Sequence, residues 1–99
     1  ETDGIPKEKA FEHIAGYTIF NDLSARDIQA REMQKRLLLL AKSLDALGPM
    51  GPCLVTQDEI ADPHALSMEL RVNNEPEPRQ KSSTRQMIFK IQALIAYWS

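Results

Sequence analysis

The pattern of apolar and polar positions changes its period several times along this chain. Residues 15–22 alternate in the way that is typical of a strand, with Tyr17 and Ile19 on one face. Residues 25–34 are mainly polar and leave a thin apolar stripe, which indicates a solvent-facing helix. A final amphipathic helix is predicted by apolar residues at the spacing i, i+3, i+4 and i+7: Ile91, Leu94, Ile95 and Trp98.

Shorter elements lie between these segments. Residues 6–13 read as a short helix that begins with a proline, and the apolar run 37–40 fits either a helix or a strand. The run Gly-Pro-Met-Gly-Pro at 48–52 is a rigid turn in which either X-Pro bond could be cis, and residues 52–56 read as a short buried strand.

A hairpin is predicted in the second half of the chain. Residues 67–72 alternate as a half-buried strand, and Asn73 and Asn74 suit the positive φ angles of a tight turn. The return strand would contain Pro76 and Pro78, which confines it to a sheet edge. Helices and strands interspersed in this way predict an α+β fold.

Composition and charge limit the possible classes of protein. Residues 1–99 allow one small domain, and 42% hydrophobic with 26% charged residues is ordinary for a globular protein. A net charge of −2 gives no indication of a nucleic-acid or membrane partner. Acids dominate residues 58–78 and bases dominate 79–99, which we interpret as two solvated faces.

Cys53 is the only cysteine, so an internal disulfide is impossible and a cytoplasmic location is expected. It follows Pro52 in an apolar run, which favours a small core residue over a nucleophile. No signal peptide or long apolar run is recognised. His13 and His64 share no metal-ligand spacing and are expected to be solvated.

Candidate chemistry centres on the junction between the first strand and the following helix. Asp22 ends the strand, Ser24 is a suitable N-cap, and Asp27 completes a capping-box pattern. Asp22 would then lie beside backbone N–H groups, where polar ligands are often held; the alternative is a capped loop with a solvated carboxylate. Lys42 follows an apolar run, and on this pattern alone it is a surface residue that covers apolar side chains with its stem.

Sequence similarity adds to this pattern. The run G-Y-T-I-F-N-D-L-S-A-R-D-I-Q at residues 16–29 closely resembles the signature of the fumarylacetoacetate hydrolase superfamily. Further blocks resemble this family in its order and spacing, at residues 42–56, 58–63, 70–73 and 83–97. The resemblance implies the mixed β-roll of the family's catalytic domain, of which residues 1–99 would be the partial, middle part.

The resemblance also implies a metal and a class of substrate. Family members hold a divalent ion, usually Mg²⁺ (Mn²⁺ or Ca²⁺ being possible), through an upstream Glu-x-Glu pair and the aspartate that corresponds to Asp22. The substrate would be a small 2-oxo or dicarbonyl acid such as an acylpyruvate. Hydrolysis of a C–C bond is the first expectation; decarboxylation, or isomerisation of 2-hydroxyhepta-2,4-diene-1,7-dioate, is the alternative because it shares the enolate intermediate.

Three further residues take roles from the family. Lys42 matches its active-site lysine, which binds the substrate carboxylate or stabilises an oxyanion. Gln29 and Arg26 lie in the substrate-side helix and would bind substrate, although Arg26 could instead pair with Asp22 or Asp27. The resemblance also implies a homodimer, because members of the family tend to dimerise.

The chain also departs from the family pattern. The Glu-x-Glu pair has no counterpart upstream of Asp22, and Ala41 stands where a glycine usually precedes the lysine. A glycine replaced by alanine can block a positive φ, which puts the placement of Lys42 in question. We therefore expect the 99 residues alone to be inactive, and a non-catalytic fragment that retains the fold and dimer contacts is the rival interpretation.

Overall fold

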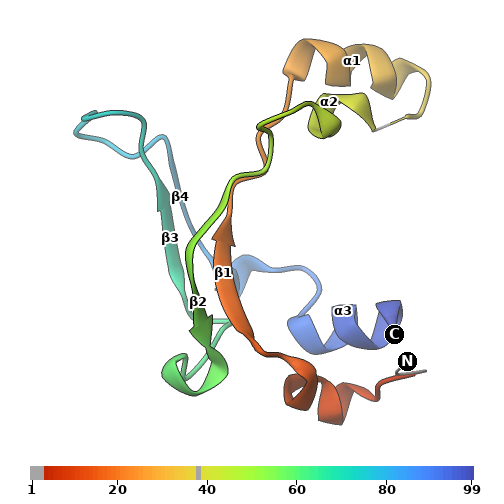
Figure 1. Cartoon of the computed structure of the whole chain (residues 1–99), viewed down its shortest axis with the longest axis vertical. Helices are drawn as coiled ribbons and strands as arrows, with labels where there is room; N and C mark the ends of the chain where they lie inside the picture. The colour runs from red at the N-terminus through yellow and green to blue at the C-terminus, as the bar shows by residue number, and fades with distance from the viewer. Residues whose placement is uncertain (1–3, 38) are drawn as a thin grey trace. The chain divides into compact units, whose positions relative to one another are not determined.

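The computed structural model describes residues 4–37 and 39–99 (Figure 1). The chain divides into two compact units, one formed by residues 16–55 and the other by residues 1–15 together with 56–99. Both units combine helices with paired strands, so the predicted α+β class is confirmed. The mixed β-roll remains a prediction. None of the helices in the described ranges has the length and hydropathy that a membrane span requires.

The unit of residues 16–55 is a two-stranded ribbon that carries two short helices. Strands β1 (Gly16–Phe20) and β2 (Met50–Thr56) pair with each other, and their arrows run in opposite directions in Figure 1. Helices α1 (Arg26–Gln34) and α2 (Leu40–Ser43) come between the two strands in the sequence, and they pack against each other. The predicted strand at 15–22 and helix at 25–34 are therefore confirmed within two residues.

The ribbon is more exposed than the sequence suggested. The expected buried strand at 52–56 is present as β2, but most of its residues are exposed, and so is Cys53, which we had expected in the core. Within its sheet β2 has β1 as its partner, and the Thr18 hydroxyl donates to the Cys53 carbonyl across the two strands at 2.8 Å. The backbones approach closely at Gly16, where an added Cβ would lie 3.1 Å from Leu54 Cγ and against the Val55 carbonyl.

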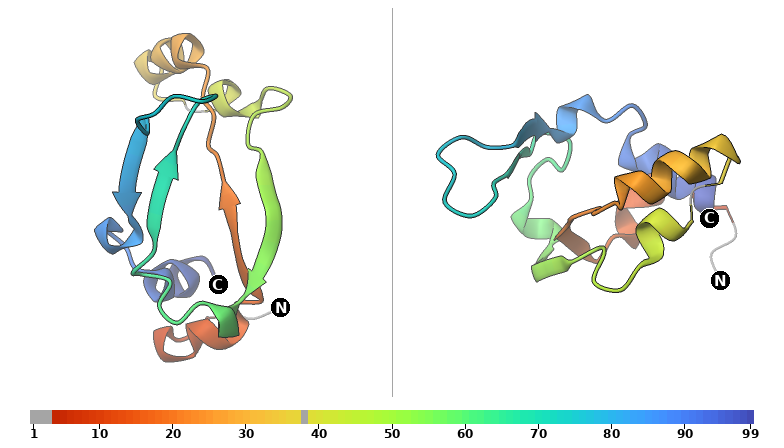
Figure 2. Two further views of the ribbon diagram at one scale, coloured as in Figure 1. Left: turned by 90° about the vertical axis from the view of Figure 1, so that its left-hand side faces the viewer. Right: turned by 90° about the horizontal axis from the view of Figure 1, so that it is seen from above.

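The second unit contains an antiparallel hairpin of β3 (Ser67–Leu70) and β4 (Gln80–Ser83), which lie side by side in Figure 2. Ser67 pairs with Ser83, and Leu70 with Gln80. The predicted positive φ is found at Asn73 (52°). The predicted return strand through Pro76 and Pro78 is wrong, because both prolines lie in the long connection before β4, where no ladder hydrogen bond is lost.

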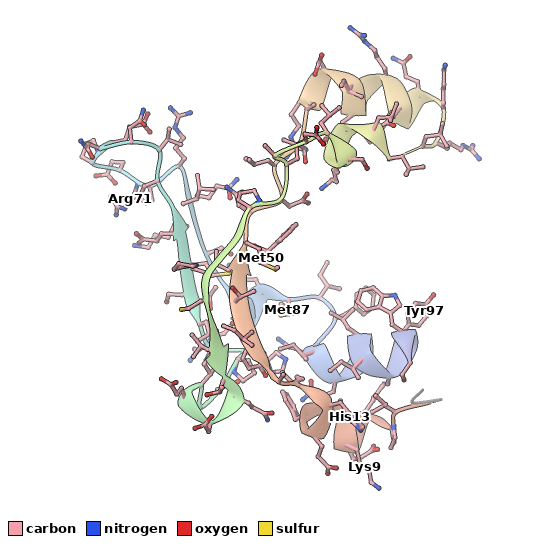
Figure 3. All side chains as sticks on the ribbon, in the orientation of Figure 1. Lys9, His13, Met50, Arg71, Met87 and Tyr97 are labelled. Carbon is pink, nitrogen blue, oxygen red and sulfur yellow. The ribbon has the colours of Figure 1, made fainter. Side chains whose placement is uncertain are left out.

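The hairpin connection is held by ion pairs on the surface. Arg79 donates to Glu75 at 2.8 and 2.6 Å, and Arg71, labelled in Figure 3, donates to Glu69 at 3.0 Å. Because these groups are substantially exposed to solvent, the pairs contribute little to stability.

The remaining elements of this unit are the 3₁₀ helices η1 (Lys7–His13), η2 (Gln57–Glu59) and η3 (Thr84–Gln86), and helix α3 (Ile91–Trp98). Helix α3 packs against η1, and Ala10 of η1 is fully buried. The predicted short helix at 6–13 and the final amphipathic helix are thus confirmed. The end of α3 is exposed, with Tyr97 directed away from the helix in Figure 3.

His64 is not the solvated residue that we expected. Its Nε2 accepts a hydrogen bond from the Ile91 backbone N–H at 3.2 Å, and its ring lies edge-on to Phe11 with 6.1 Å between the ring centroids. It therefore satisfies one of the free N–H groups at the start of α3, whose N-cap, Lys90, supplies no side-chain acceptor.

Candidate functional site

Asp22 lies immediately beyond β1, in a segment whose backbone is fixed at both ends. The Asn21 N–H donates to the Pro49 carbonyl at 3.0 Å and continues the ribbon past Phe20. Three residues after Asp22, the Ala25 N–H donates to the Ala41 carbonyl at 2.9 Å. We call this last bond, together with the two residues that it joins, the neck, because it closes the excursion of the chain through α1 and α2.

The predicted capping box is wrong. Helix α1 begins after Ala25, which has no side-chain cap, and the Ser24 hydroxyl turns back to the Asp22 carbonyl at 3.4 Å. Asp27 lies exposed in the first turn of α1, where a carboxylate favours the positive end of the helix.

The neck brings Lys42 to Asp22. Lys42 lies on α2 directly after Ala41, and its Nζ forms an ion pair with the Asp22 carboxylate. The Lys42 side chain is 40% exposed and that of Asp22 55%, so the pair is open to a small molecule from solvent. The expectation that Asp22 faces backbone N–H groups is replaced by this contact with an ammonium group. Ala41 has helical backbone, so no positive φ is required at the position where the family usually has glycine.

Arg26 and Gln29 form a second pair on α1. The two residues are one helical turn apart, and an Arg26 guanidinium N–H donates to the Gln29 side-chain oxygen at 2.6 Å. Arg26 therefore contacts Gln29 rather than Asp22 or Asp27, the partners that the sequence suggested. This contact uses one guanidinium N–H of Arg26. The other guanidinium N–H groups and the amide NH₂ of Gln29 have no acceptor within the pair.

Glu32 is a feature of this region that the sequence did not reveal. It belongs to the polar helix α1, yet it is only 9% exposed, and its carboxylate accepts backbone N–H groups from the segment just before Lys42. Nothing in the sequence distinguishes it from the other charged residues of that helix.

The described residues do not by themselves fit a magnesium site. Mg²⁺ requires several oxygen ligands in near-octahedral geometry. Across residues 4–37 and 39–99 there is no group of three or more acidic, histidine or cysteine side chains that could hold a metal ion. Asp22 supplies one carboxylate, and that carboxylate is paired with Lys42. Asp22 as a metal ligand therefore remains a prediction.

Comparison with known proteins identifies the class to which this fold and site belong. The whole chain, residues 1–99, matches the family described as fumarylacetoacetate (FAA) hydrolase C-terminal. The chain is therefore a member of the fumarylacetoacetate hydrolase family, as the sequence resemblance indicated.

Several family members are similar at the level of individual proteins. Oxaloacetate tautomerase fahd2, mitochondrial, from Xenopus laevis is 47% identical over 95 residues, which are 96% of this chain and 29% of that protein. The solved structure of fumarylacetoacetate hydrolase from Exiguobacterium antarcticum superposes with a TM-score of 0.85 at 37% identity, over 99% of this chain and 33% of that one. The structure of 2-hydroxyhepta-2,4-diene-1,7-dioate isomerase from Mycobacterium marinum superposes with a TM-score of 0.82 at 33% identity, over 97% of this chain and 35% of that one.

These relatives carry three kinds of enzyme name: a tautomerase, a hydrolase and an isomerase. The chain spans about a third of the length of the proteins it matches. It thus corresponds to a part of an enzyme domain, and the activity of a whole protein is a matter of proposal.

Proposed function

We propose that this chain is part of the catalytic domain of an enzyme that interconverts the keto and enol forms of a small 2-oxo dicarboxylic acid, with oxaloacetate as the first candidate. The observation that carries the proposal is the solvent-accessible ion pair of Lys42 and Asp22, held at the neck. The choice of reaction is supported by the 47% identity to a protein named as an oxaloacetate tautomerase.

Lys42 would stabilise the charge that forms during this reaction. When a C–H bond next to the 2-oxo group breaks, its proton passes to water and its electron pair moves onto the carbonyl oxygen, which gives an enolate. A proton delivered to that oxygen yields the enol, so the reaction needs no oxidant or reductant. An ammonium group has three N–H donors, and the contact with Asp22 leaves others free to donate to the enolate oxygen.

Arg26 and Gln29 would bind a carboxylate of the substrate. A guanidinium group presents several N–H donors in a plane that matches a carboxylate, and the amide of Gln29 adds a donor beside it. The bond between the two side chains, 2.6 Å long, holds them in one orientation before substrate arrives. Donors that are already ordered reduce the conformational-entropy cost of binding the substrate.

Hydrolysis of a C–C bond, which the sequence analysis placed first, is the second candidate. It is favoured by the 37% identity to the hydrolase from Exiguobacterium antarcticum. Hydrolysis, decarboxylation and dioate isomerisation would use the same enolate stabilisation by Lys42, so the residues of this chain are compatible with each of them. A divalent metal, a homodimer and a cytoplasmic location stay predictions; the Xenopus relative is named as mitochondrial.

A chimeric enzyme tests the proposal directly. The segment of the Xenopus tautomerase that matches this chain is replaced by the 95 matched residues, and the decay of enol oxaloacetate is followed by ultraviolet absorbance. We expect clear tautomerase activity, which Lys42→Met lowers by about 10²-fold or more. Lys35→Met is the matched control, because Lys35 is an exposed lysine at the end of α1 and should leave the rate unchanged.

The same segment is also placed in the Exiguobacterium hydrolase and assayed for cleavage of an acylpyruvate. Activity in the hydrolase host alone would replace the tautomerase proposal with the second candidate. A chimera that folds in both hosts and is inactive in both would support the interpretation of the chain as a non-catalytic fragment.

A further inference from the structure

Glu32 is a buried carboxylate on a helix that otherwise faces solvent. Its side chain lies under the segment that leads into α2, and it is the buried charged residue among those that the structure describes. Burying a carboxylate is unfavourable unless it is paired or hydrogen-bonded, so a buried glutamate on an exposed helix requires an explanation.

The carboxylate accepts hydrogen bonds from three consecutive backbone N–H groups. Its Oε1 accepts from Leu40 at 2.7 Å and from Leu39 at 3.3 Å, and its Oε2 accepts from Ala41 at 3.0 Å. The N–H groups of Ala41 and Leu40 hold the pKa of Glu32 below its ordinary value of 4.5, with a smaller effect from Leu39. The group is therefore ionised near neutral pH, when all of its oxygen lone pairs are available as acceptors.

These bonds fix the residue directly before Lys42. The Ala41 N–H is held by Glu32, and the Ala41 carbonyl accepts from Ala25 at the neck, at 2.9 Å. Ala41 is 1% exposed, so its position has little freedom. Helix α2 is only four residues long and has no side-chain cap of its own, so Glu32 takes the place of one.

We infer that Glu32 is a positioning residue for Lys42: by binding the backbone N–H groups of residues 39–41 it sets the place from which the Lys42 ammonium reaches Asp22 and the substrate oxygen. Glu32 itself contacts neither group in the structure. The inference rests on the proposed function for its consequence in catalysis. Its structural part, the dependence of the Lys42–Asp22 contact on Glu32, stands without it.

The kinetic test is a double-mutant cycle in the chimeric enzyme. Glu32→Gln keeps the length of the side chain but turns one acceptor oxygen into an NH₂ donor that faces backbone N–H groups. We expect kcat to fall by about 10- to 100-fold with KM changed less than about twofold, because a misplaced group lowers the rate more than it weakens binding. In the Lys42→Met background the same change should have almost no further effect on kcat.

A purely structural role predicts a different result. If Glu32→Gln lowers kcat by the same factor whether or not Lys42 is present, the inference is overturned. Asp27→Asn is the control for loss of one negative charge from α1, since Asp27 is exposed in the same helix; it should leave kcat unchanged. If Glu32→Gln does not fold, Glu32→Asp replaces it, because the carboxylate is kept while its reach is shortened by one methylene.

A second measurement is independent of activity. In the NMR spectrum of the 99-residue chain, the side-chain NOE between Lys42 and Asp22 should be present and should disappear in Glu32→Gln. An NOE that persists would refute the inference even if the chimera is active. Loss of the NOE together with an inactive parent chimera would refute the proposed function and leave the positioning of Lys42 by Glu32 intact.

Discussion

Replacement of Lys42 by methionine separates the two roles that this residue could have. The side chain keeps its length and its apolar stem and loses its charge. If Lys42 is a surface residue that covers apolar groups with its stem, methionine fulfils the same role and nothing measurable changes. If Lys42 stabilises an enolate oxygen, the reaction loses a charged donor at the point where charge develops.

The structure gives the size of each effect. Lys42 and Asp22 are 40% and 55% exposed, so their ion pair is well solvated and contributes about 0.2–1 kcal/mol to stability. Loss of an oxyanion donor costs about 10²–10³ in kcat, which corresponds to about 2.7–4 kcal/mol of transition-state stabilisation. The predicted loss of activity therefore exceeds the loss of stability severalfold.

Two assays measure these quantities. Urea unfolding of the 99-residue chain gives the stability change for Lys42→Met, and a cycle with Asp22→Asn gives their coupling energy, which we expect to be about 1 kcal/mol or less. Stopped-flow tautomerisation by the chimera gives kcat. An unchanged kcat in a folded variant, or a coupling energy near 4 kcal/mol in the 99-residue chain, would refute the reasoning, since the second result requires a buried structural pair.

Three other predictions concern stability and metal binding. Gly16→Ala should destabilise the ribbon by about 1–3 kcal/mol, because its Cβ would meet the Val55 carbonyl of β2; a lower urea midpoint with an unchanged m-value is the expected result. The pKa of Glu32 is lowered in the folded chain, so the stabilisation by this carboxylate is fully present above pH 4.5 and is lost as the pH falls through the folded-state pKa. Helicity can be measured by circular dichroism between about pH 5 and pH 2. It should fall more steeply with decreasing pH in the parent than in Glu32→Gln. Calorimetry should detect no saturable Mg²⁺ binding by the 99-residue chain at millimolar concentrations, and Asp22→Asn should behave identically; saturation in this range would mean that a complete ligand set exists in the chain.

Elements with strong local signals were predictable from the sequence. Helix α3 was predicted from the apolar spacing of Ile91 to Trp98, and β1 from the alternation of residues 15–22. Both patterns depend on residues that are close together in the sequence. The return strand was misplaced because a turn at Asn73 and Asn74 followed by two prolines does not reveal where pairing begins. Its actual start at Gln80 depends on the register with β3.

The site was predictable only where family resemblance supplied it. Asp22 and Lys42 are separated by twenty residues, and no periodicity shows that their side chains meet. Ser24 does not cap α1 because its hydroxyl donates to the Asp22 carbonyl. The helix begins one residue later, after Ala25, whose N–H donates to Ala41 in a contact between distant residues. The burial of Glu32 was missed for the same reason, since it is determined by the segment that folds back over α1.

The hydrogen bonds of Glu32 also have a consequence for the order in which the chain folds. Glu32 reaches only seven to nine residues ahead, whereas the bond between Thr18 and Cys53 spans 35. Loop-closure entropy grows with the logarithm of loop length, so the short closure is favoured by about 1.3 kcal/mol. We therefore expect α1 and α2 to collapse before the strands pair. Pairing of the strands would then begin at Asn21 and Pro49 and extend toward Gly16, so that folding proceeds outward from the ion pair. The most strongly constrained backbone in the unit would be the first to form.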